Sequence, residues 1–243
     1  MNKVVVITGG TSGIGLETAK ALAAQGCTVY ELSRRDKGIA QGVKHITADV
    51  TDDKQVDAAV KQIVAEAGRI DVLINNAGTN FAAPLPEFPD EKWKTVVDVQ
   101  LEAVHYLSRL VAPVMIKQGG GKIINVASAL SFSADPNATA YTVAKHGIIG
   151  MTRSYAAELG KYNISCNAIA PGFFETKLTS AIRELNPALY EKVCDRATFS
   201  PAGRGWGDAF DLMGTIVFLS SSASDYINGE VIVVDGGFKA TMA

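Results

Sequence analysis

Cysteine and histidine are scarce in this chain of 243 residues, with three of each. Cys27, Cys166 and Cys194 are scattered, odd in number and without metal-ligand spacing, which argues against a disulfide framework and a cysteine-bound metal. The histidines also lack neighbouring ligand residues, so no metal site is expected. Free thiols are typical of a reducing compartment, and we expect a cytoplasmic protein.

The chain also lacks an excess of positive charge and any long apolar run. Its formal net charge is −2 and its isoelectric point is about 5.9, so nucleic acid and anionic membrane surfaces are poor partners. No apolar stretch approaches the roughly 18 residues of a membrane helix, and Val4–Ile7 is too short for a signal peptide. These absences favour an enzyme that acts on a small molecule.

Short runs rich in β-branched residues alternate with helical segments along the whole chain. This alternation predicts a single doubly wound α/β domain over residues 1–243, with a parallel sheet of about seven strands and helices on both faces. Several runs end at Gly or Asn clusters, which places those loops at the carboxyl edge, where open α/β sheets bind ligands. The expected strands are Val4–Thr8, Cys27–Leu32, Val43–Ile46, Ile70–Ile74, Lys122–Val126, Asn163–Ile169 and Glu230–Val234.

A glycine-rich loop, TGGTSGIG over residues 8–15, follows the first expected strand. Glycines at 9, 13 and 15 allow a tight turn and close approach of a ligand, and the free N–H groups of the next helix can receive a pyrophosphate. On its own the loop also fits a plain strand-to-helix turn.

Tyr141 and Lys145 stand four residues apart in a helical pattern, and Ser128 lies thirteen residues before the tyrosine. The i,i+4 step puts both side chains on one helix face. A nearby cation favours phenolate and lowers the pKa of a tyrosine from about 10. With the glycine loop, this set indicates a dinucleotide-dependent oxidoreductase.

The chain resembles the short-chain dehydrogenase/reductase family over its whole length. The motifs that carry the resemblance fall in the family's order: TGxxxGIG at 8–15, Asp49-Val50, Asn75-Asn76-Ala77-Gly78, Ser128, Tyr141-x-x-x-Lys145, Asn167-x-x-x-Pro171-Gly172 and Thr176. The resemblance implies a Rossmann-like fold and a nicotinamide cofactor. It assigns cofactor contacts to the loop residues Gly9, Thr11, Ser12, Gly13, Ile14 and Gly15, to Asp49, Val50, Asn76, Ala77, Gly78, Tyr141 and Lys145, and to Pro171, Gly172, Phe174 and Thr176 at the nicotinamide.

Three residues at the end of the second expected strand indicate which dinucleotide is bound. Members that prefer NAD usually carry an acidic residue where Ser33 stands, whereas Arg34 or Arg35 can receive the 2′-phosphate of NADP. Glu31 is a competing carboxylate, but it lies two residues earlier, within the strand. We therefore expect NADP(H), with NAD(H) as the alternative.

The resemblance also assigns the chemistry. Ser128 would hold the substrate oxygen, Tyr141 would exchange its proton with that oxygen, and Lys145 would supply positive charge and bind the nicotinamide ribose. Loss of one of these residues would have favoured a non-catalytic dinucleotide sensor on the same fold, and all three are present.

Gln100 departs from the family pattern. It is the one polar member of a helical stripe made of Trp93, Val97, Gln100, Val104, Leu107, Val111 and Val114. The family normally has Asn here, which links the catalytic lysine to solvent through water. We count Gln100 with the catalytic residues, although a purely structural amide bonded to backbone remains an alternative.

The sequence says least about the substrate. A lid is expected over about 173–201. Within the family, the segments PAGR, DLMG and ASDYING resemble sugar-acid dehydrogenases such as gluconate 5-dehydrogenase, and PGFFET resembles 3-oxoacyl-(acyl-carrier-protein) reductases. A sugar-acid carboxylate could meet Arg153, Lys177 or Arg183, whereas the basic patch that a carrier protein needs is thin, with Lys122 present but Tyr162 at the second position.

An oligomer is also expected. Related enzymes commonly form homotetramers through the helices that hold Gln100 and Tyr141 and through the last strand. Here Val231–Val234 would be an exposed sheet edge unless it is covered or paired.

Overall fold

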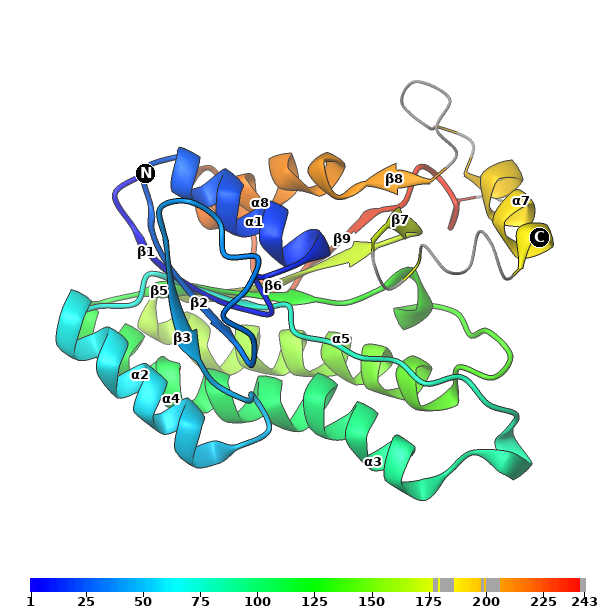
Figure 1. The fold of residues 1–243 in the computed structure, drawn as a ribbon. Helices are drawn as coiled ribbons and strands as arrows, with labels where there is room; N and C mark the ends of the chain where they lie inside the picture. The colour runs from blue at the N-terminus through cyan, green and yellow to red at the C-terminus, as the bar shows by residue number, and fades with distance from the viewer. Residues whose placement is uncertain (177–178, 180–185, 198, 200–205, 241–243) are drawn as a thin grey trace.

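A parallel sheet of seven strands forms the centre of the computed structural model, in the order β3-β2-β1-β4-β5-β6-β9 (Figure 1). The structure describes residues 1–176, 179, 186–197, 199 and 206–240. The strands are β1 Val4–Thr8, β2 Thr28–Ser33, β3 Val43–Thr47, β4 Val72–Asn75, β5 Gly121–Val126, β6 Ile164–Pro171 and β9 Val231–Val234. The predicted Rossmann-like fold is confirmed.

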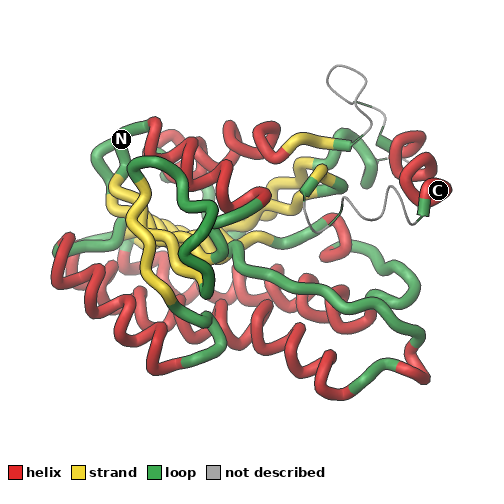
Figure 2. The backbone as a smooth tube through the Cα atoms, viewed as in Figure 1, coloured by secondary structure: helices red, strands yellow, loops and turns green. Residues whose placement is uncertain are grey.

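Helices cover both faces of the sheet (Figures 1 and 2). Val5, Ile7 and Val29 point to the face covered by α1 Gly13–Ala24 and α8 Met213–Ser220. Val6, Tyr30 and Leu73 point to the opposite face, which is covered by α2 Asp53–Ala67, α4 Ala103–Gln118 and α5 Thr139–Leu159. Successive strand residues are buried on opposite sides, as parallel strands between two helical layers require.

The remaining elements are short. They are the helices α3 Asp90–Val97 and α7 Pro187–Arg196, the π-helical turn η2 Asp98–Glu102, the strand pair β7 Phe174–Glu175 and β8 Gly207–Asp208, and the 3-10 turns η1 Leu85–Glu87, η3 Ala129–Ser131, η4 Gly160–Tyr162, η6 Ala209–Leu212 and η7 Ser222–Ser224. The β7–β8 pair was not predicted because two residues carry no alternation pattern.

The helical stripe predicted from Trp93 to Val114 is wrong at both ends. Trp93 is 39% exposed, and Val96 is buried in its place. The π-helical turn η2 lies between α3 and α4 and adds a residue to the turn, so the inward face shifts by one position. Gln100 within this turn, and Val104 and Leu107 after it, are buried as expected, and the stripe ends at Met115 rather than Val114.

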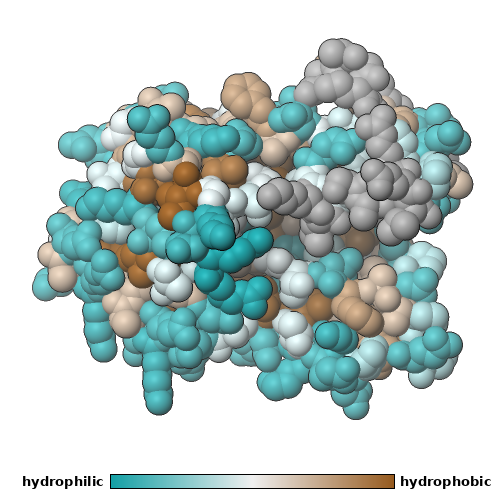
Figure 3. Space-filling view, viewed as in Figure 1, coloured by the Kyte–Doolittle hydropathy of each residue, from teal (hydrophilic) through white to brown (hydrophobic). Residues whose placement is uncertain are grey.

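The surface is mainly hydrophilic on the face seen in Figure 3, especially over the helices below the sheet. Among the described residues, no helix has both the length and the apolar character needed to cross a membrane.

Candidate active site

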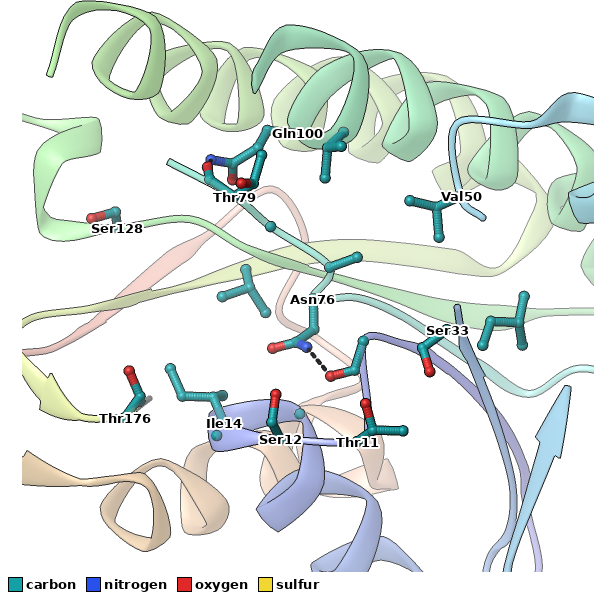
Figure 4. A pocket seen from close by; sticks show the side chains of 18 of the residues that line it. Thr11, Ser12, Ile14, Ser33, Val50, Asn76, Thr79, Gln100, Ser128 and Thr176 are labelled. Carbon is teal, nitrogen blue, oxygen red and sulfur yellow. Dashed lines mark hydrogen bonds between the residues drawn. The ribbon is translucent and has the colours of Figure 1, made fainter. Parts of the chain in front are cut away.

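One cavity of about 500 Å³ lies at the carboxyl edge of the sheet. Ser33 lies at one end of it, and Ser128 and Thr176 lie at the other (Figure 4). All the site residues predicted from the sequence line this cavity: Gly9, Thr11, Ser12, Gly13, Ile14, Gly15, Ser33, Arg34, Arg35, Asp49, Val50, Asn76, Ala77, Gly78, Gln100, Ser128, Tyr141, Lys145, Pro171, Gly172, Phe174 and Thr176.

The glycine loop turns sharply between β1 and α1. Gly9 and Gly13 have φ values of 70° and 54°, a left-handed conformation that glycine adopts without strain. A Cβ on Gly15 would lie 2.3 Å from the carbonyl oxygen of Gly9 and 2.4 Å from the Asn76 side chain. Asn76 in turn donates to the carbonyl oxygens of Thr8 and Gly9 at 2.9 and 3.2 Å, which holds the loop against β4.

The start of α1 is suited to an anion. Its N-cap residue, Ser12, makes no side-chain capping bond, and the first turn contains no acidic residue. The N–H groups of an uncapped helix N-terminus and its dipole favour a phosphate. The loop and helix start therefore fit the pyrophosphate of a dinucleotide.

At the far end of the cavity, β2 and β3 end side by side. Ala48 donates from its backbone N–H to the carbonyl oxygen of Ser33 at 3.0 Å, which ties the two strand ends together. Arg34 lies 3.8 Å from the carboxylate of Asp49, and its side chain is 78% exposed. Both Arg34 and Arg35 line the cavity beside Ser33.

Three side chains meet at the other end. Ser128 lies two residues after the end of β5 and caps η3. Its hydroxyl oxygen accepts a 3.2 Å hydrogen bond from the backbone N–H of Leu130. Tyr141 and Lys145 share one face of α5, with the Lys145 Nζ 5.5 Å from the centroid of the Tyr141 ring. Lys145 is buried, and its Nζ donates to the carbonyl oxygen of Val126 at 2.7 Å.

Burial controls both pKa values. It raises the pKa of Tyr141 above its usual 10, against the smaller lowering effect of the hydrogen bond with Ser128. Burial also lowers the pKa of Lys145 to about 7. The lowering of the Tyr141 pKa expected from Lys145 is therefore not found in the free protein, where desolvation of the phenolate is the main influence. Tyr141 is protonated at neutral pH, which is the form that a proton donor needs.

Gln100 sits in η2 with 1% of its surface exposed. Its Nε2 donates to the carbonyl oxygen of Thr79 at 2.7 Å (Figure 4). Its Oε1 is buried and has no partner among the described residues. A buried amide oxygen without a partner is costly, so this atom is an acceptor available to a small donor such as water.

Residues 171–176 close the cavity beside the glycine loop. A Cβ on Gly13 would lie 3.5 Å from the Thr176 side chain, so this segment packs closely on the loop. Within the predicted lid over 173–201, α7 is a helix. Residues 177–178, 180–185, 198 and 200–201 of that lid lie outside the described residues.

Sequence reasoning missed Ser131, which joins the serine loop to the catalytic helix. Its Oγ accepts from the backbone N–H of Ser128 at 3.1 Å and donates to the carbonyl oxygen of Lys145 at 2.7 Å. The S-x-x-S spacing of a capping box could have revealed it. The carbonyl groups of Thr79 and Val126 were also missed, because backbone acceptors leave no trace in residue identity.

The substrate contact predicted for Arg153 is not supported, and the residues considered for a carrier-protein patch lie away from the cavity. Arg153 is exposed on α5, about 18 Å along the helix axis from Tyr141, and it does not line the cavity. Lys122 stands at the start of β5, at the opposite edge of the sheet, and its Nζ pairs with Asp225 at 2.9 Å. Tyr162 lies in η4, before β6, and is also outside the cavity lining. Lys177 and Arg183 lie outside the described residues.

Comparisons with known proteins agree with this geometry. The family model described as enoyl-(acyl carrier protein) reductase matches residues 9–239. A 2-dehydro-3-deoxy-D-gluconate 5-dehydrogenase of Dickeya dadantii is 40% identical over 247 residues, covering 98% of this chain and 96% of that protein. A 3-oxoacyl-(acyl-carrier-protein) reductase of Thermotoga maritima is 38% identical over 245 residues, covering 97% of each.

A solved structure shows the same fold. The gluconate 5-dehydrogenase of Burkholderia cenocepacia, crystallised in complex with NADP and tartrate, superimposes with a TM-score of 0.92 at 35% identity and covers 100% of this chain and 97% of that chain. Matches of this extent, in sequence and in structure, fix the family. The chain belongs to the short-chain dehydrogenase/reductase family and is an oxidoreductase.

Proposed function

We propose that this protein is an NADP(H)-dependent dehydrogenase/reductase that interconverts a ketone and a secondary alcohol on a small sugar acid. The observation that carries the reaction type is the single cavity in which the glycine loop, Ser128, Tyr141 and Lys145 come together. The substrate class is supported by relatives of that kind, such as the gluconate 5-dehydrogenase of Gluconobacter oxydans, 37% identical over 247 residues.

The cofactor proposal rests on this chain's own residues. The uncapped start of α1 would bind the pyrophosphate, and Arg34 and Arg35 beside Ser33 would bind the 2′-phosphate. The cavity-lining residues at the end of β2, which are Leu32, Ser33, Arg34 and Arg35, include no carboxylate. The neighbouring carboxylate, Asp49 after β3, lies 3.8 Å from Arg34. When bound, NADPH supplies a hydride to the substrate carbonyl carbon.

Ser128 and Tyr141 would then act on the substrate oxygen, and Lys145 would act on Tyr141. Ser128 donates a hydrogen bond to the carbonyl oxygen and holds it beside Tyr141. Tyr141 gives its proton to that oxygen in reduction and accepts it back in oxidation. Lys145, fixed by the Val126 carbonyl, binds the nicotinamide ribose and favours the tyrosinate once its ammonium is charged. The free Oε1 of Gln100 would hold a water next to this set.

The substrate carboxylate needs a cation near Ser128. Among the described cavity-lining residues, Lys145 is the only cation at that end, and its role is taken. We therefore propose Lys177 or Arg183, from the lid, as its partners. A carrier-protein substrate is less well supported, because Lys122 and Tyr162 do not border the cleft.

A cofactor-fluorescence assay of NADPH oxidation tests this proposal. The panel would contain 5-ketogluconate, 2-dehydro-3-deoxygluconate derivatives, acetoacetyl thioesters, steroids and diketones. We expect the highest kcat/KM with a keto sugar acid. Turnover of acetoacetyl thioesters far above that of every sugar acid would assign the protein to the acyl reductases instead. NADPH binding with no turnover on any substrate would favour the dinucleotide sensor.

We also propose a homotetramer. β9 ends the sheet and pairs only with β6 among the described strands. The large apolar side chains exposed on the described surface include Phe210 at 70%, the fully exposed Tyr226, and Val143 on α5 at 45%. Burial of this area against other copies would remove it from water.

A further inference from the structure

Glu31 is the most deeply buried carboxylate in the described part of the chain, with none of its surface exposed. Glu31 lies within β2, between β3 and β1. To hold the ribose of an adenosine, its side chain would have to face the cavity. It does not line the cavity. Burying a carboxylate costs free energy unless its oxygens are paired, so its partners indicate what it does.

Each oxygen of Glu31 has its own partner. Oε1 accepts a 3.0 Å hydrogen bond from the backbone N–H of Gly10, in the glycine loop. Oε2 lies 2.5 Å from Nδ1 of His45, in β3. The other ring nitrogen of His45, Nε2, lies 3.0 Å from the Thr47 hydroxyl at the end of β3.

These contacts form a chain across three strands, directly beneath the cofactor cleft. It starts in the loop after β1, passes through β2 and ends at the last residue of β3, next to Ala48 and Asp49 of the cavity lining. Backbone bonds reinforce it, from Gly9 N–H to the Leu32 carbonyl at 2.8 Å and from Ala48 N–H to the Ser33 carbonyl at 3.0 Å.

Gly10 fits this contact closely. A Cβ at residue 10 would lie 2.4 Å from Cγ of Glu31, so the loop rests on the glutamate side chain. The N–H of Gly10 is thereby turned to the carboxylate, away from the cleft. The side chain of Glu31 thus sets both the height and the orientation of the loop that would meet the pyrophosphate.

We propose that Glu31 and His45 are positioning residues for the dinucleotide: they hold the loops after β1, β2 and β3 at the spacing that the pyrophosphate and the adenosine half require. This role rests on the proposed cofactor. The pair acts on cofactor affinity and leaves the chemistry at Ser128, Tyr141 and Lys145 unchanged. Ser128 lies at the other end of the cavity from Ser33 (Figure 4), and Tyr141 and Lys145 lie beside it.

The test compares two faces of the same two strands. Glu31→Met keeps the side-chain length but removes both contacts, and His45→Phe keeps a ring but removes the pair. Tyr30→Phe is the matched control. On the opposite face of the sheet, the Tyr30 hydroxyl donates to the Glu66 carboxylate at 3.0 Å. It also accepts a 3.1 Å hydrogen bond from Nζ of Lys44, a residue of β3, so it links the same two strands.

NADPH affinity is measured directly by fluorescence titration, with no substrate present, together with the melting temperature of each variant. We expect the Kd for NADPH to rise about tenfold in Glu31→Met, equivalent to about 1.4 kcal/mol, and severalfold in His45→Phe. The control should stay within about twofold of wild type. Glu31→Gln should be close to wild type, because the amide oxygen can still accept from Gly10 and the NH₂ group stays within hydrogen-bond reach of His45.

The double variant Glu31→Met/His45→Phe distinguishes a loss of fold stability from a loss of cofactor positioning. It replaces both members of a buried polar pair by apolar groups and should melt near the wild-type temperature, yet still bind NADPH weakly. An unchanged Kd in Glu31→Met or in the double variant would overturn the proposal, and so would an equal loss of affinity in Tyr30→Phe. Failure of the wild type to bind NADPH would instead refute the cofactor assignment itself.

Discussion

Tyr141 and Lys145 have pKa values that move in opposite directions for the same reason, which is their burial. In each case the uncharged form is favoured, so the free enzyme holds a neutral phenol beside a lysine that is about half charged at neutral pH. Positive charge gained at Lys145 then favours loss of the proton from Tyr141. The pair is therefore set to respond to a change of charge in the cavity.

Tyr141→Phe tests the proton transfer. The ring remains in place and only the hydroxyl is lost, so we expect kcat to fall below about 5% of wild type while the Kd for NADPH changes less than about threefold. Single-turnover NADPH oxidation and fluorescence titration measure the two quantities. Retention of substantial turnover would show that another group supplies the proton.

The buried ammonium of Lys145 should make stability depend on pH. With a folded pKa of about 7 and an unfolded pKa near 10.5, the unfolded chain binds more protons between these values, so this residue's contribution to the free energy of unfolding rises with pH across that window. Lys145→Met should therefore be more stable than wild type at pH 6–7, by on the order of 4 to 5 kcal/mol, and the gain should disappear near pH 10.5. Urea unfolding of cofactor-free protein at several pH values checks this, and a gain independent of pH would contradict it.

Ser33→Asp tests the cofactor preference. We expect wild-type kcat/KM to favour NADPH over NADH by at least about tenfold, which a phosphate contact of roughly 1.4 kcal/mol provides. A carboxylate at the end of β2 should repel the 2′-phosphate and shift the preference towards NADH. Ser221→Asp is a suitable control, because Ser221 is a serine outside the cavity lining. Equal use of NADPH and NADH by the wild type would contradict the proposed preference for NADP(H).

At the scale of single elements, the π-helical turn η2 has the largest effect on the site. It breaks the continuity of α3 and α4 and turns Gln100 into the interior, where its amide spans from Thr79 towards the cavity. A straight α-helix with the same sequence would have kept Trp93 and Gln100 on one face. With the π-helical turn, Gln100 keeps the inward position predicted from the sequence, whereas Trp93 turns outward.

Gln100→Asn tests what this turn is for. The shorter amide can restore the family's usual residue, so we expect kcat within about threefold of wild type if the residue holds a water beside Lys145. Gln100→Leu should lower kcat more strongly, by about tenfold or more, with a changed pH profile. A large fall in melting temperature for Gln100→Asn with kcat preserved would instead support a structural amide.

Many of the strands and cavity-lining residues could be predicted from the sequence. The seven main strands were recognised because each is a short run with β-branched residues bounded by turn residues, and their ends differ from the observed ends by at most two positions. The cavity-lining residues were recognised because the family motifs stand at the ends of those strands. The π-helical turn, the β7–β8 pair and the Glu31–His45 contact were not, because each depends on residues brought together only by tertiary packing.

At the scale of the whole molecule, the unpaired edge of β9 and the exposed aromatic residues favour assembly of several copies of the chain. We expect light scattering at micromolar concentration to give about four times the chain mass of 25.6 kDa. Tyr226→Asp should weaken the assembly, because a charge would be buried in the contact. A monodisperse particle of one chain mass would refute the tetramer.

The sheet order also has a consequence for synthesis on the ribosome. β6, which holds the catalytic half of the sheet, pairs on one side with β9, the last strand. The Asn228 side chain accepts from the backbone N–H of Cys166 at 2.9 Å and donates to the carbonyl oxygen of Ala156, on the catalytic helix α5, at 3.0 Å. A nascent chain released as far as β5 contains every partner of β1, β2, β3 and β4, and the glycine loop can take shape during elongation. The scaffold of α5 and β6 is complete only after residue 234 has left the exit tunnel, so the pairing of the first four strands can precede completion of the half of the sheet that holds Ser128 and Tyr141.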